Sequence, residues 1–335
     1  MAVFGTGITP GGSLGTELSY VTRRAYVPCM VVQLYNSSPT MASLLANAQT
    51  AYGGVSQVTV PVQGAAYVTG QWSDYSGAFN QPATLQGSYV AEYNLKLYIV
   101  PIPFLGMEAA VQLDHAVIPL VEARLNDATN TTMQDFSTAI FTNTTNLQAF
   151  IGLPGAIDDG TNMATYGNIN RTNLPFWNSK RYAGGSINPT RQLMLQYIAG
   201  VTKNGAEVPS FGVMGFGTWT LLAQDYQGQE QYVIAPGSGF DSDADRPRSG
   251  FRALDVAGVP FFADPYMPEG SVYLVQNNYL NLYVHQQASF QFTGFETMIS
   301  NMQLGYIGAV VTIAELVSTK PKSMGVVTGL NSLTI

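Results

Sequence analysis

Two stretches in the first third of the chain alternate apolar and polar residues. In the first, Val58, Val60 and Val62 are separated by polar or turn residues. In the second, every other residue from Tyr89 to Ile99 is apolar. The apolar positions there are Tyr89, Ala91, Tyr93, Leu95, Leu97 and Ile99, with Glu92, Asn94 and Lys96 on the opposite face. A period of two is typical of half-buried strands, so we expect a β-hairpin ribbon over residues 54–100.

The segment between these strands is the expected tip of the ribbon. It reads QGAAYVTGQWSDYSGAFNQPATLQGS and carries a single charge, Asp74. A two-stranded ribbon is marginal in water, so we expect it to lie on another surface. Trp72, Tyr75 and Phe79 are the expected contact residues.

A helical pattern follows over residues 106–142. Apolar residues recur there at three-, four- and six-residue steps, at Met107, Val111, Val117, Val121, Leu125 and Ala128, and Phe136 and Ile140 continue the stripe. This spacing predicts one long helix of about 55 Å. Pro119 predicts a kink or a late start of that helix.

The remaining segments combine an arm with an α/β block. Six glycines and prolines before residue 16 predict an extended arm, followed by a short helix over Met41–Ala48. Residues 152–179 are loop-rich. Helices are then expected at Arg191–Gly200 and Thr218–Gln227, and strands at Phe211–Met214, Val259–Ala263, Ser271–Gln276, Tyr279–His285, Ala288–Phe292 and Tyr306–Val317.

The charge content is unusually low. Charged residues make up 10% of the 335 residues, whereas about 25% is ordinary for soluble domains. Interface cores are depleted in charge, so this composition favours a protein covered by copies of itself. A β-rich domain of the secreted type is the other interpretation, and composition alone leaves it open. The net charge of -7 disfavours tight electrostatic binding to nucleic acid.

Motifs for catalysis or metal binding are weak. Gly11–Gly15 matches a nucleophile elbow around Ser13, but lacks the expected strand and helix. Asp241, Asp243 and Asp245 resemble a calcium loop, but Arg246 replaces its glycine. The two histidines belong to no cluster, and the single cysteine, Cys29, suits a reducing cytoplasm. We therefore expect no catalytic, cofactor or metal site; a hydrolase acting through Ser13 is a distant alternative.

Three stretches in order carry a family resemblance. They are LQAFIGLPGAIDDGTNMATYGNINRTNLPFW (147–177), VAGVPFFADPYMPEGSVYLVQNNYLNLYVH (256–285) and YIGAVVTIAELVSTKPKSMGVVTG (306–329). Together with the ribbon and helix upstream, they resemble the major capsid proteins of tailed bacteriophages, whose subunits have the Hong Kong 97-like shell fold. The resemblance covers nearly the whole chain.

The resemblance implies an α+β fold with a defined division. Residues 1–53 would be an N-terminal arm and 54–100 an extended loop lying over a neighbouring subunit. Residues 101–186 would be a peripheral domain containing the spine helix 106–142. Residues 187–278 would form the axial α/β domain, and 279–335 would return to the peripheral domain.

The resemblance also implies the function and its partners. The chain would assemble into pentamers and hexamers of an icosahedral head around double-stranded DNA, in the host cytoplasm and finally in the virion. A separate scaffolding protein, a portal and a decoration protein are the expected partners. Arg23 and Arg24 are expected to pair with acidic residues of an adjacent copy. The one lysine of the ribbon, Lys96, lies in its stem, which disfavours covalent cross-linking during maturation. An encapsulin-like compartment enclosing enzyme cargo is the alternative.

Overall fold

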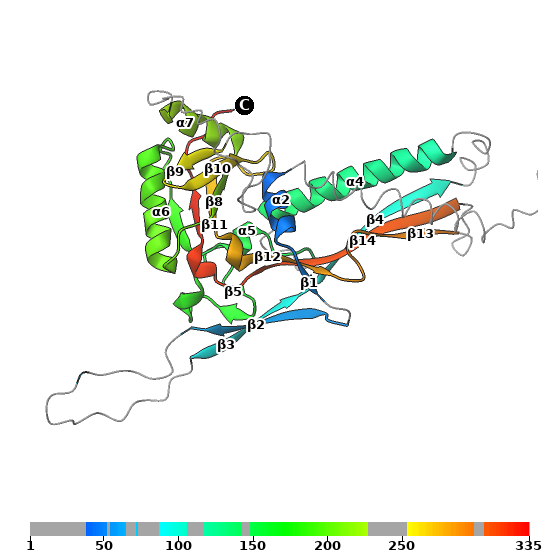
Figure 1. Cartoon of the computed structure of the whole chain (residues 1–335), viewed down its shortest axis with the longest axis horizontal. Helices are drawn as coiled ribbons and strands as arrows, with labels where there is room; N and C mark the ends of the chain where they lie inside the picture. Colours follow the sequence, from blue (N-terminus) through cyan, green and yellow to red (C-terminus); the bar gives the residue numbers. More distant parts are fainter. Residues whose placement is uncertain are drawn as a thin grey trace, which may run out of the picture.

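Two main β-sheets organise an α+β fold in which helices cover one face of each sheet (Figure 1). The computed structural model of the chain describes residues 38–51, 54–64, 72, 87–105, 117–142, 148–226, 253–297 and 305–334. Within this part the first sheet has five strands and the second has six. Two smaller two-stranded sheets accompany them.

The long strand β14 (Gly305–Ser318) is the centre of the first sheet. It pairs along one edge with β4 (Lys96–Leu105) over ten residues. Along its other edge it pairs with β12 (Leu280–His285) and β13 (Gln291–Thr297), and β1 (Gln49–Ala51) joins β12 in parallel. Every strand except β1 is antiparallel to its neighbour in this sheet.

Helix α4 (Val117–Thr142) runs along one face of the first sheet (Figure 1). Its 26 residues span about 39 Å at 1.5 Å per residue. The ring of Phe136 meets that of Tyr98 on β4 at 5.1 Å, edge to face. Arg124 lies 4.5 Å over the ring of Phe104. The expected helix over 106–142 is thus present from Val117, and residues 106–116 lie outside the described part.

The second sheet is packed on both faces. On one face, Met194, Ile198 and Val201 of α6 (Arg191–Gly205) and Leu222 of α7 (Phe216–Tyr226) form a core with its strands. The opposite face belongs to a larger core shared with the first sheet. The strand order is β7 (Lys180–Ala183), β15 (Gly325–Thr328), β11 (Ser271–Val275), β8 (Phe211–Met214), β10 (Val259–Ala263) and β9 (Leu254–Val256).

The chain passes between the two sheets through two short 3-10 turns. One, η3 (Asn277–Tyr279), leads from β11 into β12, and the other, η5 (Pro321–Ser323), leads from β14 into β15. Lys320, Glu207 and Tyr279 link these turns, because Glu207 accepts hydrogen bonds of 2.7 Å from both the ammonium and the phenol. The ammonium and the phenol hold the pKa of Glu207 below its ordinary value.

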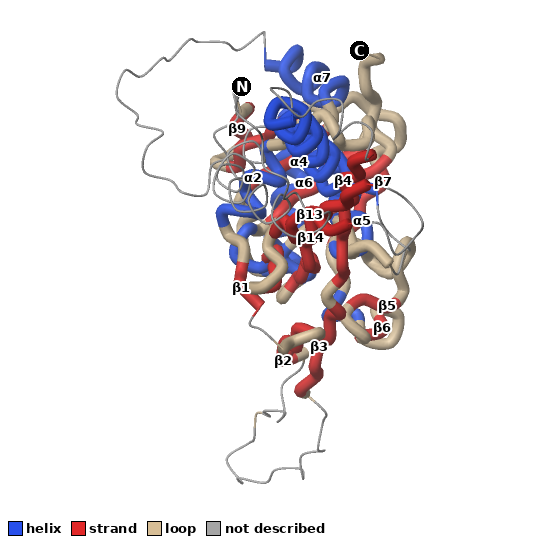
Figure 2. The backbone as a smooth tube through the Cα atoms, turned by 90° about the vertical axis from the view of Figure 1, so that its right-hand side faces the viewer, coloured by secondary structure: helices blue, strands red, loops and turns tan. Residues whose placement is uncertain are grey.

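The expected ribbon is present, and its stem lies on the body of the same subunit. It consists of β2 (Gln57–Gln63) and β3 (Ser88–Asn94). Ala91 and Tyr93 are buried, and the three valines of β2 pack against the same core. Figures 1 and 2 show the ribbon projecting from one end of the body.

One predicted strand is two strands in different sheets. The alternation from Tyr89 to Ile99 was expected to place one face inside throughout, and this was wrong beyond Leu95. There the chain leaves the ribbon and enters the first sheet as β4. Leu97 and Ile99 are consequently 54% and 50% exposed, while Ile102 and Phe104 are buried.

Several smaller elements differ from expectation. The short helix α2 (Pro39–Ala46) and helix α7 each begin two residues earlier than expected, and β13 begins at Gln291 rather than Ala288. The loop-rich stretch contains α5 (Leu153–Ala156), β5 (Thr165–Tyr166), β6 (Ile169–Asn170) and η1 (Pro175–Trp177). Strands β7 and β15 were not expected, and β15 joins the second sheet rather than the first. The division into domains otherwise stays a prediction.

Candidate assembly surfaces

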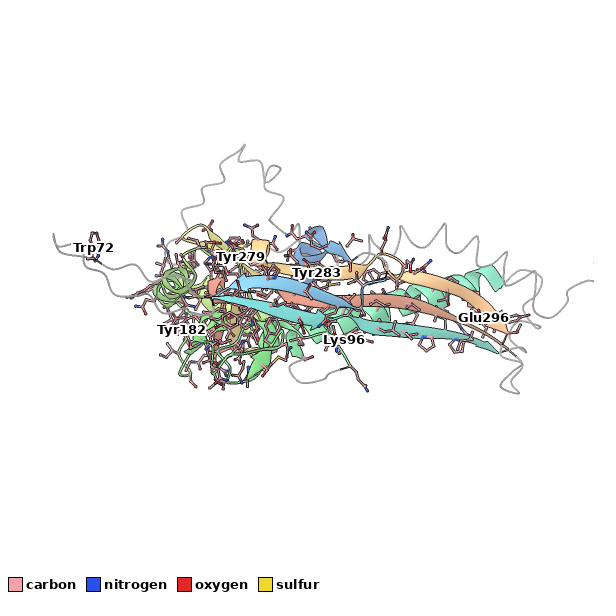
Figure 3. The ribbon with its side chains drawn as sticks, turned by 90° about the horizontal axis from the view of Figure 1, so that it is seen from below. Trp72, Lys96, Tyr182, Tyr279, Tyr283 and Glu296 are labelled. Atoms are coloured by element: carbon pink, nitrogen blue, oxygen red, sulfur yellow. The ribbon has the colours of Figure 1, made fainter. Side chains whose placement is uncertain are left out.

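Trp72 is the described residue that best fits the expected contact role of the ribbon. Its side chain is 103% exposed, and Figure 3 shows it far from the body. An exposed indole is a large apolar surface that gains free energy when a partner covers it. The other expected contacts, Arg23, Arg24, Tyr75 and Phe79, lie outside the described residues.

The ribbon stem is fixed to the body by directional bonds. The Tyr93 phenol donates to the carbonyl of Ser318 at 2.8 Å, and the amide of Glu92 donates to the carbonyl of Gly167 at 3.0 Å. Burial raises the pKa of the Tyr93 phenol well above its ordinary value, so it stays a donor. These bonds fix the stem of the ribbon to the body of its own subunit.

A buried ion pair shapes the segment beneath the stem. Arg171 and Asp158 are fully buried. Arg171 donates to the carbonyls of Gly155 and Ala156 at 2.8 and 2.7 Å. Asp158 accepts the amides of Gly160, Asn162 and Met163 and the Arg181 guanidinium. Burial lowers the pKa of Arg171. The loop-rich stretch is therefore a rigid platform rather than a free loop.

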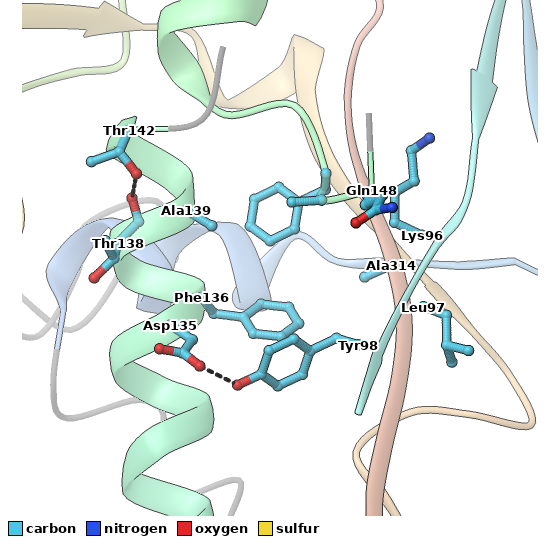
Figure 4. Close-up of a pocket in the computed structure, with 12 residues that line it drawn as sticks. Lys96, Leu97, Tyr98, Asp135, Phe136, Thr138, Ala139, Thr142, Gln148 and Ala314 are labelled. Atoms are coloured by element: carbon cyan, nitrogen blue, oxygen red, sulfur yellow. Dashed lines mark hydrogen bonds between the residues drawn. The ribbon is translucent and has the colours of Figure 1, made fainter. Parts of the chain in front are cut away.

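A cavity of about 380 Å³ opens between α4 and β4 (Figure 4). Aromatic rings of Tyr98, Phe136 and Phe150 line it, and Lys96, Asp135, Thr138 and Gln148 contribute polar groups. The Tyr98 phenol donates to the Asp135 carboxylate at 2.7 Å. Burial and this carboxylate raise the pKa of Tyr98. The cavity therefore combines aromatic walls with the polar Tyr98–Asp135 pair.

Glu315 is a buried acid near the C-terminal end of β14, the central strand of the first sheet. It is 1% exposed, and its Oε1 accepts the amide of Ile151 at 3.1 Å. Its Oε2 has no hydrogen-bond partner among the described residues. Burial raises the pKa of this carboxyl to about 8, so it is protonated at neutral pH.

Most residues of the motifs considered for catalysis or metal binding lie outside the described part. Ser13, Asp241, Asp243, Asp245 and His115 all lie there. His285 is described, and its Nδ1 accepts the amide of Gln287 at 3.3 Å. Among the described residues no three His, Cys, Asp or Glu side chains gather as metal ligands. Within the same residues, no helix has the length and apolarity needed to span a membrane.

Comparison with solved structures identifies the class of fold. No family model and no curated protein matches the sequence. Solved structures do match, over most of the chain and at low identity. The two-sheet architecture with its projecting ribbon and these matches give the chain the Hong Kong 97-like capsid fold, as the sequence resemblance predicted.

Three of the similar structures are shell proteins. The capsid subunit of cyanophage A-1(L) has a TM-score of 0.68 at 16% identity, covering 88% of this chain and 93% of that one. The capsid of a native GTA particle has a TM-score of 0.56 at 12% identity, covering 87% of this chain and 90% of that one. The SrpI encapsulin complex of Synechococcus elongatus has a TM-score of 0.52 at 11% identity, covering 93% of this chain and 92% of that one.

Proposed function

We propose that this chain is the major capsid protein of a tailed bacteriophage. Copies would assemble as pentamers and hexamers into an icosahedral head enclosing double-stranded DNA, without catalysis by the chain itself. The observation that carries the proposal is a shell-protein fold that extends over nearly the whole chain. Assembly would take place in the host cytoplasm, and the assembled protein would reside in the virion.

The composition and the ribbon support assembly as the function. A chain with 10% charged residues has little charge with which to cover a monomer. The ribbon would cross onto a neighbouring subunit, with Trp72, Tyr75 and Phe79 as contacts, and the arm with Arg23 and Arg24 would meet another copy. The axial domain, residues 187–278, would meet its copies at the five- and six-fold positions.

Further components would complete the particle. A separate scaffolding protein would guide the procapsid, a portal would admit the genome, and a decoration protein would reinforce the mature head. The DNA would be held by enclosure, since a net charge of -7 gives no strong attraction to a polyanion.

A compartment of the encapsulin kind is the second candidate. The likeness to an encapsulin complex favours it, because both kinds of shell use this fold. An encapsulin-like shell would enclose an enzyme in place of a genome.

Two experiments test the proposal. Electron microscopy of the purified chain, alone and with the proteins encoded beside it, should show closed shells, tubes or capsomers. A chain that stays monomeric at every concentration under both conditions would refute it. Nuclease-protected DNA in particles from the native source supports the phage head, whereas a co-purifying enzyme and no DNA supports the compartment.

A further inference from the structure

Three lysines gather where the end of α6 meets η5 and the start of β7, at the end of the molecule opposite to β13 (Figure 1). The Lys180 amide donates to the carbonyl of Met324, directly after η5, at 3.1 Å. The side chain of Asn204, in the last turn of α6, donates to the carbonyl of Lys322 at 3.0 Å. Lys203 precedes Asn204 in that turn. Lys180, Lys203 and Lys322 are all exposed, so their ammonium groups share one region of the surface.

Tyr182 lies between the lysines of β7 and α6. Its ring is 5.7 Å from the Lys180 ammonium and 4.8 Å from the ring of Tyr197. A Cβ on Gly200 would collide with the Tyr182 hydroxyl, so the phenol rests against the backbone of α6. Lys203 stands one turn after Gly200 and therefore shares that side of the helix. This surface thus combines ammonium groups with a half-buried phenol.

The described residues provide no carboxylate for these three lysines. None of the three forms a salt bridge within that part of the chain. Two carboxylates of neighbouring segments are already engaged, because Glu207 pairs with Lys320 at 2.7 Å and Asp158 pairs with Arg181 at 3.1 Å. An anion that neutralises the three lysines must therefore come from elsewhere.

Helix capping explains only part of this cluster. The carbonyl end of α6 carries partial negative charge, which favours Lys203 in its last turn. Lys180 lies on a strand and gains nothing from that helix end. Like charges gathered on one surface raise its potential and attract an anion. In a chain with a net charge of -7 and 14 basic residues, the three lysines thus make a local region of opposite sign.

We propose that Lys180, Lys203 and Lys322, together with Tyr182, bind phosphate groups of the packaged DNA. This inference rests on the proposed function, which encloses a polyanion in the particle. Lysine binds phosphate as a point charge, and a phenol can donate a hydrogen bond to a phosphate oxygen. Three such contacts are weak, but a shell presents the same surface many times to one DNA molecule. The lysines would position the DNA nearest the shell, while enclosure holds the rest.

Chemical labelling of particles from the native source tests the contact. An acetylating reagent is applied to DNA-filled particles and to particles emptied of DNA, and mass spectrometry measures each lysine. The three lysines should be acetylated severalfold less in filled particles, whereas Lys96 and Lys320, the internal controls, should be acetylated equally in both. Low acetylation of the three in both kinds of particle would assign the surface to a protein partner, and high acetylation in both would leave it uncovered. Either result overturns this inference alone, while particles that contain no DNA would refute the proposed function.

Single substitutions measure the same contacts in the unassembled full-length subunit, with a short DNA duplex as the probe. The association constant of the wild type should fall about 40-fold between 50 and 200 mM salt, as expected when three phosphates are neutralised. Lys180→Gln should reduce this fall to about 12-fold, and Lys180→Arg, which keeps the charge, should restore it. Lys96→Gln is the matched control and should leave the salt dependence unchanged. An equal salt dependence in Lys180→Gln and the wild type would show that Lys180 contacts no phosphate.

Discussion

Asp264 accepts a hydrogen bond of 2.5 Å from the hydroxyl of Ser38, a residue 226 positions earlier in the chain. The same Oδ2 accepts the hydroxyl of Thr40 at 2.8 Å, and Oδ1 accepts the amide of Tyr266 at 3.0 Å. All three side chains of Ser38, Thr40 and Asp264 are buried. This carboxylate therefore ties the start of α2 to the turn after β10.

Replacing Asp264 should be costly. Asp264→Ala leaves two buried hydroxyls without their acceptor, and we expect the free energy of unfolding to fall by roughly 2–4 kcal/mol. Asp255→Ala is the matched control, because its carboxylate accepts the amide of Gly258 in an exposed turn. Chemical denaturation of the unassembled subunit measures both. Equal losses of unfolding free energy in the two variants would show that the buried hydrogen bonds of Asp264 stabilise the chain no more than one exposed turn does.

Glu315 should make stability depend on pH. Its pKa is about 8 in the folded chain, against an ordinary value of 4.5. Between these values the unfolded chain ionises while the folded chain stays protonated. The contribution of Glu315 to stability should therefore be greatest below pH 4.5 and decline as pH rises to about 8, by up to about 1.4 kcal/mol per pH unit, then level off.

Glu315→Gln should remove this decline, because the amide keeps an acceptor for Ile151 but does not ionise. The measurement is the denaturation midpoint of both proteins at pH 5.5, 7 and 8.5. The difference in stability between the wild type and the variant should be smallest at low pH, should change as the pH rises because the wild type alone loses stability, and should stay constant above about pH 8. Parallel curves throughout would mean that Glu315 titrates normally in the folded chain.

Trp72 should contribute to the strength of assembly but not to the stability of the subunit. A side chain that is 103% exposed contributes no packing within the chain, so Trp72→Ala should leave the unfolding midpoint unchanged. If a neighbour covers the indole, the same substitution should weaken assembly, since central aromatic contacts typically contribute about 2 kcal/mol or more. Particle yield against subunit concentration reports the effect. An unchanged critical concentration would remove Trp72 from the contacts.

The elements that could be predicted from sequence are those whose pattern is local. Helix α6 follows an Asn-Pro-Thr start and β8 and β10 are short apolar runs, so each was expected close to its observed place. Strand β15 was not, because its partners β7 and β11 lie far away in sequence. Three of the four residues of β15 are buried, and their burial depends on pairings that no local sequence window contains.

The exposure of Leu97 and Ile99 on β4 was missed for a related reason. From Leu97 to Leu105 every residue is apolar, so periodicity cannot tell which side of the strand is buried. The side is set by α4, which packs on Tyr98 and Phe104. Trp72, in contrast, was singled out from sequence as an apolar residue near the tip of the ribbon; its side chain is exposed, and its role as a contact stays a prediction.

Glu269 should stabilise the start of α7. Its carboxylate accepts the amides of Gly217 and Thr218 at 3.0 and 3.1 Å. First-turn amides lack acceptors within their helix, so Glu269→Ala should cost about 1–2 kcal/mol and accelerate hydrogen exchange at both amides. Glu269→Gln should cost less, because an acceptor oxygen remains. Glu296→Ala, at an exposed position of β13, is the control. Comparable hydrogen exchange at the Gly217 and Thr218 amides in all variants would argue against capping by Glu269.

Two adjacent residues at the end of α6 should respond with opposite signs. Ala206 is exposed and adopts a left-handed conformation with φ of 62°. Glycine adopts this conformation without steric penalty, so Ala206→Gly should raise the free energy of unfolding by about 0.5–1 kcal/mol.

Gly205, the residue before it, is buried against the turn η5. A Cβ on Gly205 would lie 2.4 Å from the Cα of Ser323, a backbone atom that cannot turn aside. Alanine normally favours a helix over glycine, yet here Gly205→Ala should destabilise the chain by roughly 1–3 kcal/mol, because η5 must move away from α6. Thermal unfolding of both single variants decides the matter. Stabilisation by Gly205→Ala would mean that α6 and η5 are packed less closely than their backbone contact implies.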